Sequence, residues 1–314
     1  MLAVGIVQFG GPEVLRLMEL PDPEVGPGEI RVRVHAATVN PTDTVLRSGG
    51  RADRLKDIPP PHIPGMDAAG VVEQIGEDAG TDLRIGERVM AIVVPLGQHG
   101  AYAERVVVPA ASVARSPSLG SDAQAATIPM NGLTVRQALD ELALEPGQTL
   151  AVTGAAGAVG GYAVQMGKAA GLHVIADAAP RDEELVLALG ADVIVPRGDD
   201  FASRVRQIAV DGVDGLIDGA VMSAVVVPAV RDGGRIATLR GYEGGGVESR
   251  GITFCPVFVR NYATKHDKLD DLRDLAEQGE LTLRVARSLP AAEAPEAHRL
   301  LEAGGVRGRL VLEF

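Results

Sequence analysis

A glycine- and alanine-rich segment at residues 148–165 limits the fold of this chain more than any other part of it. A short apolar run ends at Gly154, and a stretch with helical character follows Gly160 and continues to about residue 170. A strand, a tight glycine turn and a helix place free backbone N–H groups and a positive dipole end at a pyrophosphate. We therefore expect cofactor contacts along the whole turn, at Gly154, Ala155, Ala156, Gly157, Ala158, Val159 and Gly160.

Two glycines of this turn have distinct expected roles. Gly157 would let the backbone approach the phosphates, and Gly160 would let the helix lie tight against the strand. Ala155 stands where the strict fingerprint has its first glycine. The motif alone would also fit a plain strand-to-helix turn, so its surroundings decide its meaning.

The residues after the turn alternate between short apolar runs and segments of helical length. Strands are expected at residues 172–176, 191–195, 214–218 and 234–239, and helices at 181–189, 201–210 and 222–231. This alternation predicts a parallel sheet with helices on both faces. Ligands bind such sheets at the carboxyl ends of the strands. We therefore predict an α/β fold, a Rossmann doubly wound parallel sheet with its cofactor at the glycine turn.

The two ends of the chain have a different pattern. Polar and apolar residues alternate over residues 13–17 and 29–35, which is typical of antiparallel sheet with one solvated side. Further β-type runs lie at 67–75, 87–94 and 101–108, a helix is expected over 124–144, amphipathic helices at 265–278 and 295–303, and a closing strand at 309–312. At 314 residues two domains are expected. We predict a β-rich domain from residues 1–120 and 260–314, interrupted by a nucleotide-binding domain at 121–259.

Charge and cysteine content narrow the possible partners. A net charge of −12 argues against nucleic acid or an anionic membrane as the main partner. No apolar run approaches the roughly 20 residues that span a bilayer, and the start lacks the basic flank of a signal peptide. The single cysteine, Cys255, excludes an internal disulfide and is expected to be a buried, inert thiol. We expect a cytoplasmic protein.

Six short motifs occur in an order that resembles one family. They are Asn40-Pro41-Thr42-Asp43, residues 63–72, Gly100-Ala101-Tyr102-Ala103-Glu104, Asn131-Gly132-Leu133-Thr134, residues 154–160 and residues 189–192. The set resembles the zinc-independent quinone oxidoreductase branch of the medium-chain dehydrogenase/reductase superfamily. The resemblance implies a GroES-like, barrel-like catalytic domain beside the Rossmann domain, and hydride transfer from NADPH to a quinone or an activated alkene.

Zinc ligands are missing at the positions where relatives that use zinc have them. Asn40 stands in place of the cysteine of Cys-x-x-Asp, and Met66 and Asp67 stand in place of a histidine and a glutamate. The six histidines show no ligand spacing, and one cysteine cannot form a four-cysteine lobe. Too few ligands remain for a tetrahedral site, so we predict no metal.

Substrate-side residues follow from the resemblance, each with a plainer alternative. Asn40 could donate a hydrogen bond to a substrate carbonyl or to the nicotinamide carboxamide, or it could be a turn residue. Asp43 could orient its neighbours or cap a helix. Arg47 could face an anionic substrate or be a solvated helix-end residue. Tyr242 could wall the substrate pocket or lie on the surface. Relatives often carry a tyrosine shortly after an Arg-x-Gly like the one at Arg47, and none follows here, so the proton donor is unassigned.

Five more residues are expected near the cofactor. Thr134 resembles a cofactor-contacting residue of the family, although it could be a plain helix residue. Asp218 ends a predicted strand near the adenosine side, where a simple strand-end turn is the alternative. Leu239, Arg240 and Gly241 end the next strand and are expected close to the nicotinamide.

The choice between the two nicotinamide cofactors rests on Asp177 and Arg181. Asp177 follows the second predicted strand, 23 positions after Gly154. A carboxylate about 20 residues after the motif usually holds the ribose hydroxyls of NAD and repels a 2′-phosphate. Arg181 could grip that phosphate with two charge-assisted hydrogen bonds, or it could simply pair with Asp177 on the surface. Because the family resemblance points to NADPH, we predict NADP(H) over NAD(H).

The leading hypothesis is an NADPH-dependent reductase of a small quinone or α,β-unsaturated carbonyl compound, without zinc. One alternative is an enoyl-thioester reductase. Another is a low-turnover NADPH-binding protein of a sensor or crystallin-like kind. We also predict a homodimer, because residues 252–259 form an apolar run expected at a sheet edge, although Pro256 could blunt that edge.

Overall fold

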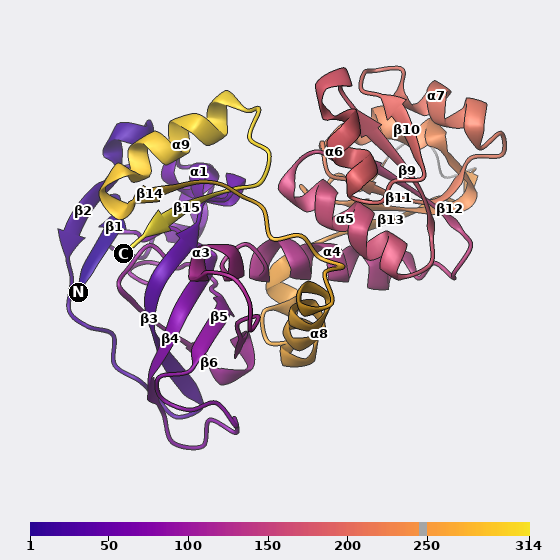
Figure 1. Ribbon diagram of the computed structural model, residues 1–314. Helices are drawn as coiled ribbons and strands as arrows, with labels where there is room; N and C mark the ends of the chain where they lie inside the picture. The colour runs from indigo at the N-terminus through magenta and orange to yellow at the C-terminus, as the bar shows by residue number, and fades with distance from the viewer. Residues whose placement is uncertain (245–249) are drawn as a thin grey trace. The chain divides into compact units, whose positions relative to one another are not determined.

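The computed structural model describes residues 1–244 and 250–314, which form two compact units (Figure 1). The first unit consists of Met1–Met130, Ala263–Glu277 and Leu283–Phe314, and the second of Asn131–Tyr262 and Gln278–Thr282. Both chain ends therefore belong to the first unit, and the second is inserted between them. The division falls after Met130 rather than at residue 120, and a short return segment at 278–282 joins the second unit.

The first unit is built on a seven-stranded sheet with β3 (Glu29–Thr38) near its middle. The other strands are β4 (Asp67–Ile75), β5 (Arg88–Ile92), β6 (Arg105–Pro109), β7 (Val113–Arg115), β14 (Val285–Pro290) and β15 (Arg309–Glu313). Their order is β14-β15-β3-β4-β5-β7, and β6 pairs with β3. β3 is antiparallel to β4, β6 and β15. Its buried residues alternate with less buried ones, as the polar and apolar alternation predicted.

Shorter elements complete the first unit. A two-stranded sheet joins β1 (Leu2–Gly5) to β2 (Arg16–Glu19), and the helices are α1 (Pro41–Arg47), α2 (Ala52–Leu55), α3 (Asp122–Ala125), α8 (His266–Glu277) and α9 (Ala294–Ala303). One hydrophobic core runs from β1 through β3 and β6 to α9 and β15. The C-terminal segment is therefore part of the same core as the N-terminal strands.

The second unit is a six-stranded sheet in which every paired strand is parallel. Its strands are β8 (Thr149–Thr153), β9 (His173–Ala178), β10 (Val193–Pro196), β11 (Val213–Asp218), β12 (Val230–Thr238) and β13 (Thr253–Pro256). The order β10-β9-β8-β11-β12-β13 runs outward in both directions from β8 and β11. This is the Rossmann strand order, with its switch point between those two strands. The predicted doubly wound parallel sheet is confirmed.

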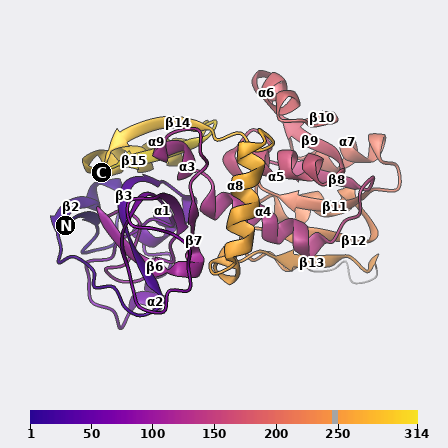
Figure 2. The same ribbon diagram turned by 60° about the horizontal axis from the view of Figure 1, so that its bottom comes forward.

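The helices of the second unit connect these strands. They are α4 (Pro129–Leu142), whose first two residues belong to the first unit, α5 (Ala158–Ala169), α6 (Glu183–Ala188) and α7 (Phe201–Ile208). Figure 2 shows β11, β12 and β13 side by side at one end of the sheet. The apolar run at 252–259 thus contributes the edge strand β13, which confirms its predicted place at a sheet edge. Cys255 in this strand is 7% exposed, so the expected buried thiol is also confirmed.

The prediction of one continuous helix over 124–144 is wrong. The structure has two helices, α3 and α4, and the second begins at Pro129. Proline lacks the N–H that a helix interior requires and disfavours the helical conformation of the residue before it. It is accepted at the first position of a helix, so α4 starts there.

The helix predicted over 222–231 is also wrong. The structure has a 3-10 helix at Ser223–Ala229, followed directly by β12. This segment contains three consecutive valines before Pro228. Branched side chains at Cβ and an internal proline both disfavour an α-helix.

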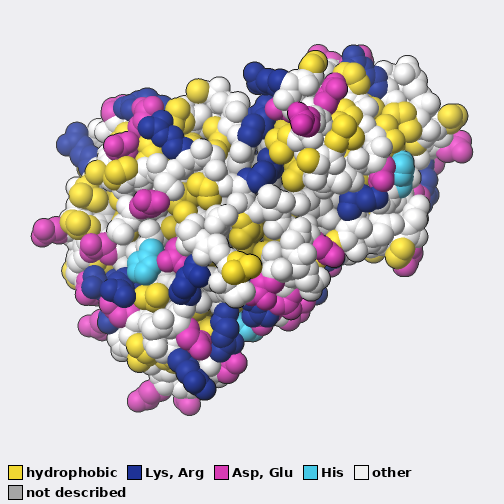
Figure 3. Space-filling view, in the orientation of Figure 1, with side chains coloured by type: hydrophobic (Ala, Val, Ile, Leu, Met, Phe, Trp, Pro, Cys, Tyr) yellow, Lys and Arg dark blue, Asp and Glu magenta, His cyan; other side chains and the backbone are white. Residues whose placement is uncertain are grey.

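None of the helices that the structure describes is long and apolar enough to cross a membrane. On the face drawn in Figure 3, basic side chains are interspersed with acidic ones over both units.

Candidate functional site

The glycine turn lies between β8 and α5, where the sequence predicts it. Gly154 follows β8 with a φ of 69°, a left-handed conformation that favours glycine. Gly157 is the N-cap residue of α5. A Cβ added to Gly160 would overlap the carbonyl group of Gly154, so the first turn of α5 lies directly on the glycine turn. The close packing predicted for Gly160 is confirmed.

Exposure divides the seven residues of the turn into two groups. Ala155, Ala156 and Gly160 are buried, whereas Gly154, Gly157, Ala158 and Val159 are partly exposed. The exposed part combines the N-terminus of a 12-residue helix with small side chains. These features fit the phosphates of a dinucleotide, because backbone N–H groups and a positive dipole end attract anions.

Asp177 joins this turn to the neighbouring strand. Its side chain is buried within β9, and its Oδ1 accepts a hydrogen bond from the Ala155 N–H at 3.0 Å. Its Oδ2 accepts one from Arg197 Nε, also at 3.0 Å. Both carboxylate oxygens are therefore engaged inside the unit, one by the glycine turn and one by a cation.

Arg197 is a residue that the sequence analysis missed. It directly follows β10, and its side chain remains 43% exposed. The sequence did indicate this pair, because Asp177 and Arg197 lie at the carboxyl ends of two predicted strands, and these ends lie along one edge of a parallel sheet. The alternative that Asp177 pairs with Arg181 is wrong. Arg181 lies in a 3-10 turn (Pro180–Asp182), and its side chain is 76% exposed and 3.9 Å from the Asp182 carboxylate.

Asp218 closes the loop that follows β11. It is 2% exposed and accepts hydrogen bonds from Thr153 Oγ1 (2.8 Å), Met222 N (3.0 Å) and Ser223 N (2.7 Å). Within this loop Val221 and Ser223 have positive φ angles of 58° and 56°, a strained conformation for side chains other than glycine. These contacts are typical of a strand-end turn, which was the alternative to a role for Asp218 near the adenosine.

The other residues expected near the cofactor lie in the second unit as well. Thr134 is buried in α4. Leu239, Arg240 and Gly241 directly follow β12 at the carboxyl edge of the sheet, where Leu239 is half-buried and the other two are exposed.

Tyr242 is half-buried rather than a plain surface aromatic. Its ring packs edge-on against Phe254 of β13, with the ring centroids 5.6 Å apart. Its backbone carbonyl accepts a hydrogen bond from Thr238 Oγ1 at 2.8 Å. Tyr242 therefore contributes to the packing of the sheet edge.

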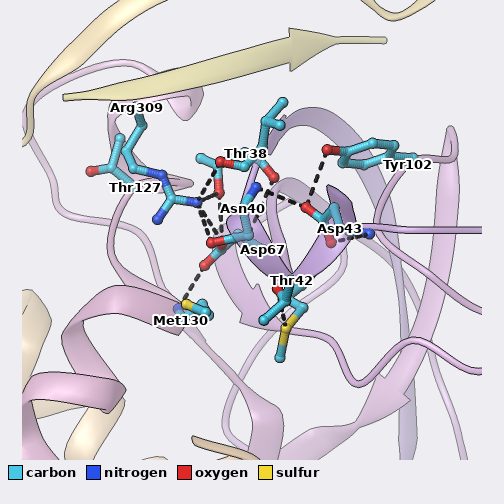
Figure 4. Close-up of polar contacts among 12 residues, drawn as sticks. Thr38, Asn40, Thr42, Asp43, Asp67, Tyr102, Thr127, Met130 and Arg309 are labelled. Carbon is cyan, nitrogen blue, oxygen red and sulfur yellow. Dashed lines mark hydrogen bonds and ion pairs between the residues drawn. The ribbon is translucent and has the colours of Figure 1, made fainter. Parts of the chain in front are cut away.

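In the first unit a buried cation lies among the Asn40 and Asp67 side chains (Figure 4). Arg309 of β15 donates from Nη2 to Asn40 Oδ1 at 2.7 Å and to Asp67 Oδ2 at 3.1 Å, and it also contacts Thr38 Oγ1. Asp67 additionally accepts hydrogen bonds from Asn40 Nδ2 (2.8 Å) and from the Met130 N–H (2.6 Å). Ion pairing and hydrogen bonding together allow this carboxylate to be buried completely.

These side chains do not fit a zinc ion. Asn40 Oδ1 and Asp67 Oδ2 already bind the Arg309 guanidinium, Asp67 Oδ1 accepts from the Met130 N–H, and the Met66 thioether accepts a hydrogen bond from Thr42 at 3.2 Å. An amide, a thioether and one ion-paired carboxylate are not the donor set of a tetrahedral zinc site. Within the ranges 1–244 and 250–314, no group of three or more His, Cys, Asp or Glu side chains could hold a metal.

Asn40 itself is fully buried, and both ends of its amide are bound within the first unit. It also caps α1 together with Asp43, because the Asn40 N–H donates to Asp43 Oδ2 at 2.8 Å. The Gly65 N–H donates to Asp43 Oδ1 at 3.1 Å, and Tyr102 Oη donates to Asp43 Oδ2 at 3.2 Å. The capping role of Asp43 is thereby confirmed. Burial raises the pKa of Asp43 to about 6, against the opposing effect of these donors.

Neither alternative considered for Arg47 holds. Its side chain is 4% exposed, so it is not a solvated helix end. Its guanidinium is bound by Glu302 of α9 at 2.6 Å, by the Gly10 carbonyl at 3.1 Å and by His298 Nδ1 at 3.4 Å, so it does not face a substrate. Sequence gave no sign of this contact, because Arg47 and His298 are 251 residues apart.

A Rossmann-type sheet with a glycine turn, inserted into a β-rich unit, is an architecture suited to a nucleotide-dependent dehydrogenase or reductase. The family described as "Alcohol dehydrogenase GroES-like domain" matches residues 26–118, and "Zinc-binding dehydrogenase" matches residues 189–312. The first match confirms the predicted GroES-like domain.

Relatives of known name cover nearly the whole chain. A quinone oxidoreductase from Pseudomonas aeruginosa is 30% identical, with 97% of each chain covered. A chloroplastic NADPH-dependent alkenal/one oxidoreductase from Arabidopsis thaliana is 29% identical, over 97% of this chain and 77% of the relative. A crystal structure of an NAD-dependent alcohol dehydrogenase superposes with a TM-score of 0.88 at 33% identity, over 100% of both chains. The chain belongs to the medium-chain dehydrogenase/reductase superfamily, among its quinone oxidoreductases, and is an oxidoreductase with a nicotinamide cofactor.

Proposed function

We propose that this protein is an NADPH-dependent reductase of quinones or α,β-unsaturated carbonyl compounds that works without zinc. The names of the Pseudomonas and Arabidopsis relatives support this substrate class. The nicotinamide supplies the hydride when it is bound. The protein binds and orients both molecules and excludes water.

The observation that carries the proposal is the Arg309–Asp67 ion pair, in which Nη2 lies 3.1 Å from Oδ2. A zinc enzyme needs a ligand set that can surround the cation and leave one position open for substrate. Here Asp67 and Asn40 are instead bound to a guanidinium. Without zinc to polarise a carbonyl group, the substrate must already be electron-poor in order to accept the hydride, as quinones and α,β-unsaturated carbonyl compounds are.

The preference for NADPH rests on Asp177 and Arg197. Because the Asp177 side chain is 1% exposed and its two oxygens are in contact with Ala155 and Arg197, the ribose hydroxyls of NADH have little access to it. Its charge is neutralised by Arg197, which uses Nε for this contact and whose side chain is still 43% exposed. We assign the 2′-phosphate to the terminal amino groups of Arg197, which can form charge-assisted hydrogen bonds with it. Arg181, on the segment after β9, is the second candidate.

The assembly proposed for the protein is a homodimer. β13 is an edge strand of the parallel sheet, and a symmetry-related copy of the strand would pair its free backbone groups. The cytoplasmic location stays a prediction.

A turnover assay over a panel of quinones, enones and enoyl thioesters tests the function. We expect loss of reduced-nicotinamide absorbance with quinones or enones, faster with NADPH than with NADH and unchanged by a chelator. Turnover restricted to enoyl thioesters would favour the thioester reductase. Tight NADPH binding without turnover on any compound would favour the binding protein.

A further inference from the structure

A line of buried polar side chains in the first unit connects helix α9 to the cap of α1. Arg47 Nη1 lies 3.4 Å from His298 Nδ1, and His298 Nε2 lies 3.2 Å from Tyr102 Oη. Tyr102 Oη in turn lies 3.2 Å from Asp43 Oδ2 (Figure 4). All four side chains are buried, so water does not substitute for these contacts.

The chemistry of Arg47 sets the direction of the whole line. A guanidinium nitrogen can only donate, so His298 Nδ1 must be the acceptor. A neutral imidazole that accepts at Nδ1 carries its proton on Nε2, and this N–H donates to the Tyr102 oxygen. The Tyr102 O–H is then left to donate to Asp43. Every hydrogen bond therefore points from Arg47 towards the carboxylate.

The charge states at the two ends agree with this direction. Burial, together with the positive charge of Arg47, lowers the pKa of His298 to about 3, so the imidazole is neutral at physiological pH. The neighbours that hydrogen-bond Asp43 are all donors, namely the Asn40 N–H, the Gly65 N–H and the Tyr102 O–H. Among them a protonated Asp43 could donate only to the Tyr102 oxygen, and Tyr102 would then have to turn its own O–H away from the carboxyl group. Protonation of this carboxyl group therefore breaks the line.

Other charged groups face the line from neighbouring elements. Glu302 of α9 forms an ion pair with Arg47 at 2.6 Å and is the outer, partly exposed end. At the inner end the negative charge of Asp67 raises the pKa of Asp43, and Arg309 of β15 is the ion-pair partner of Asp67. The line thus lies between the Arg47–Glu302 and Arg309–Asp67 ion pairs. Among the residues that the structure describes, Asp43 itself has no cation as a partner and is bound by the polarised Tyr102 O–H.

We propose that Arg47, His298 and Tyr102 are positioning residues that act together as a one-directional hydrogen-bond relay, which keeps Asp43 an anion and so holds the Asn40 turn at the start of α1. The relay does not deliver protons, because the guanidinium at its outer end does not release one. The proposal rests on the proposed function only in treating the Asn40 turn as part of the active site. The relay extends that site to α9, which is far from Asn40 in the sequence.

The first test measures the wild-type protein and uses a variant only to identify signals. Nitrogen-15 NMR of the histidines, with the His298 signals identified by their loss in His298→Gln, reports which ring nitrogen carries the proton. We expect the Nε2–H tautomer, neutral from about pH 5 to 8. An Nδ1–H tautomer or a charged His298 at neutral pH would overturn the relay.

The second test removes its last donor. Tyr102→Phe keeps the ring that packs in the core and deletes the O–H, and carbon-13 NMR then follows the titration of the Asp43 carboxyl group. Losing a donor to the anion should raise its midpoint by about one pH unit. The matched control is Tyr262→Phe, which deletes an O–H that donates to Asp140 at 3.0 Å in the second unit and should leave Asp43 unchanged. An unchanged midpoint in Tyr102→Phe would contradict the proposal.

The third test separates positioning from mere stability. In an active enzyme the acid limb of the kcat profile should follow the Asp43 midpoint and move upward with it in Tyr102→Phe, while KM for NADPH stays the same. A shifted midpoint with an unmoved acid limb would overturn the positioning role. The two NMR tests do not require reductase activity. A protein that passes them but turns over no substrate would therefore contradict the proposed function and not the relay.

Discussion

Replacing Arg197 by alanine should weaken NADPH binding and leave NADH binding nearly unchanged. The 2′-phosphate would lose a charge-assisted partner, which contributes about 1.5 to 3 kcal/mol when it is well placed. Because the Arg197 side chain is 43% exposed, solvent screening puts the effect at the lower end. About 1.4 kcal/mol corresponds to roughly a tenfold higher Kd for NADPH.

The same substitution also leaves the buried Asp177 carboxylate without its cation. The Ala155 N–H remains as its hydrogen-bond donor, so the charge stays buried beside the turn. This adds repulsion toward the 2′-phosphate and costs some stability. Arg197→Lys keeps the positive charge but not the fork of donors, and should fall between wild type and alanine.

The assay is a titration of each variant with NADPH and NADH, followed by cofactor fluorescence well below the temperature of unfolding. Arg181→Ala is the matched control, since it removes a guanidinium from the turn after β9, on a side chain that is 76% exposed. We expect it to change the NADPH Kd less than Arg197→Ala does. Asp177→Asn should preserve NADPH binding, because the amide oxygen can still accept from Ala155.

Three results would refute the reasoning. Equal losses for the two cofactors in Arg197→Ala would show that the residue does not read the 2′-phosphate. A larger loss in Arg181→Ala would transfer the role to that residue. A selective loss of NADH binding in Asp177→Asn would show that the carboxylate holds the ribose despite its contacts in the structure.

Three further predictions concern metal, assembly and the glycine turn. The purified protein should contain no stoichiometric zinc, because Asp67 is bound by Arg309; elemental analysis that finds zinc lost together with activity would contradict this. It should be a dimer by light scattering at micromolar concentration, through the edge strand β13, and a monomer there would disprove that interface. Gly160→Ala should lower the free energy of unfolding by about 2 kcal/mol or more, because the added Cβ overlaps the Gly154 carbonyl group. Gly157→Ala is its control in the same denaturation assay, since its Cβ would lie 3.1 Å from that oxygen, and equal losses would disprove the packing argument.

Much of the fold could be predicted because the relevant patterns are local. Short apolar runs separated by helical segments predicted the parallel sheet, and all six of its strands overlap the expected ranges. The errors arose where local rules compete. Pro129 begins a helix in the middle of an expected one, and a run of valines before Pro228 forms a 3-10 helix.

The candidate site was predictable only in part. The glycine turn and the helix cap at Asp43 depend on neighbours within a few residues, and both were expected from the motifs. The two alternatives considered for Arg47 and the surface pairing of Asp177 with Arg181 were wrong, because the partners of Arg47 and Asp177 come from other parts of the chain. A charged side chain in a motif shows which chemistry is possible, but not which group it meets.

The sequence by itself determined the class of protein, since glycines with special backbone requirements and the period of apolar residues act through short-range sterics and burial. Tertiary structure alone decided the electrostatics of the site. Asp177 meets Arg197 across 20 residues, and Asp67 meets Arg309 across 242. Both carboxylates are buried, and because burying a charge without a partner is costly, each is held by a cation that folding brings to it. The identity of these pairs therefore depends on which strands the finished sheets place side by side.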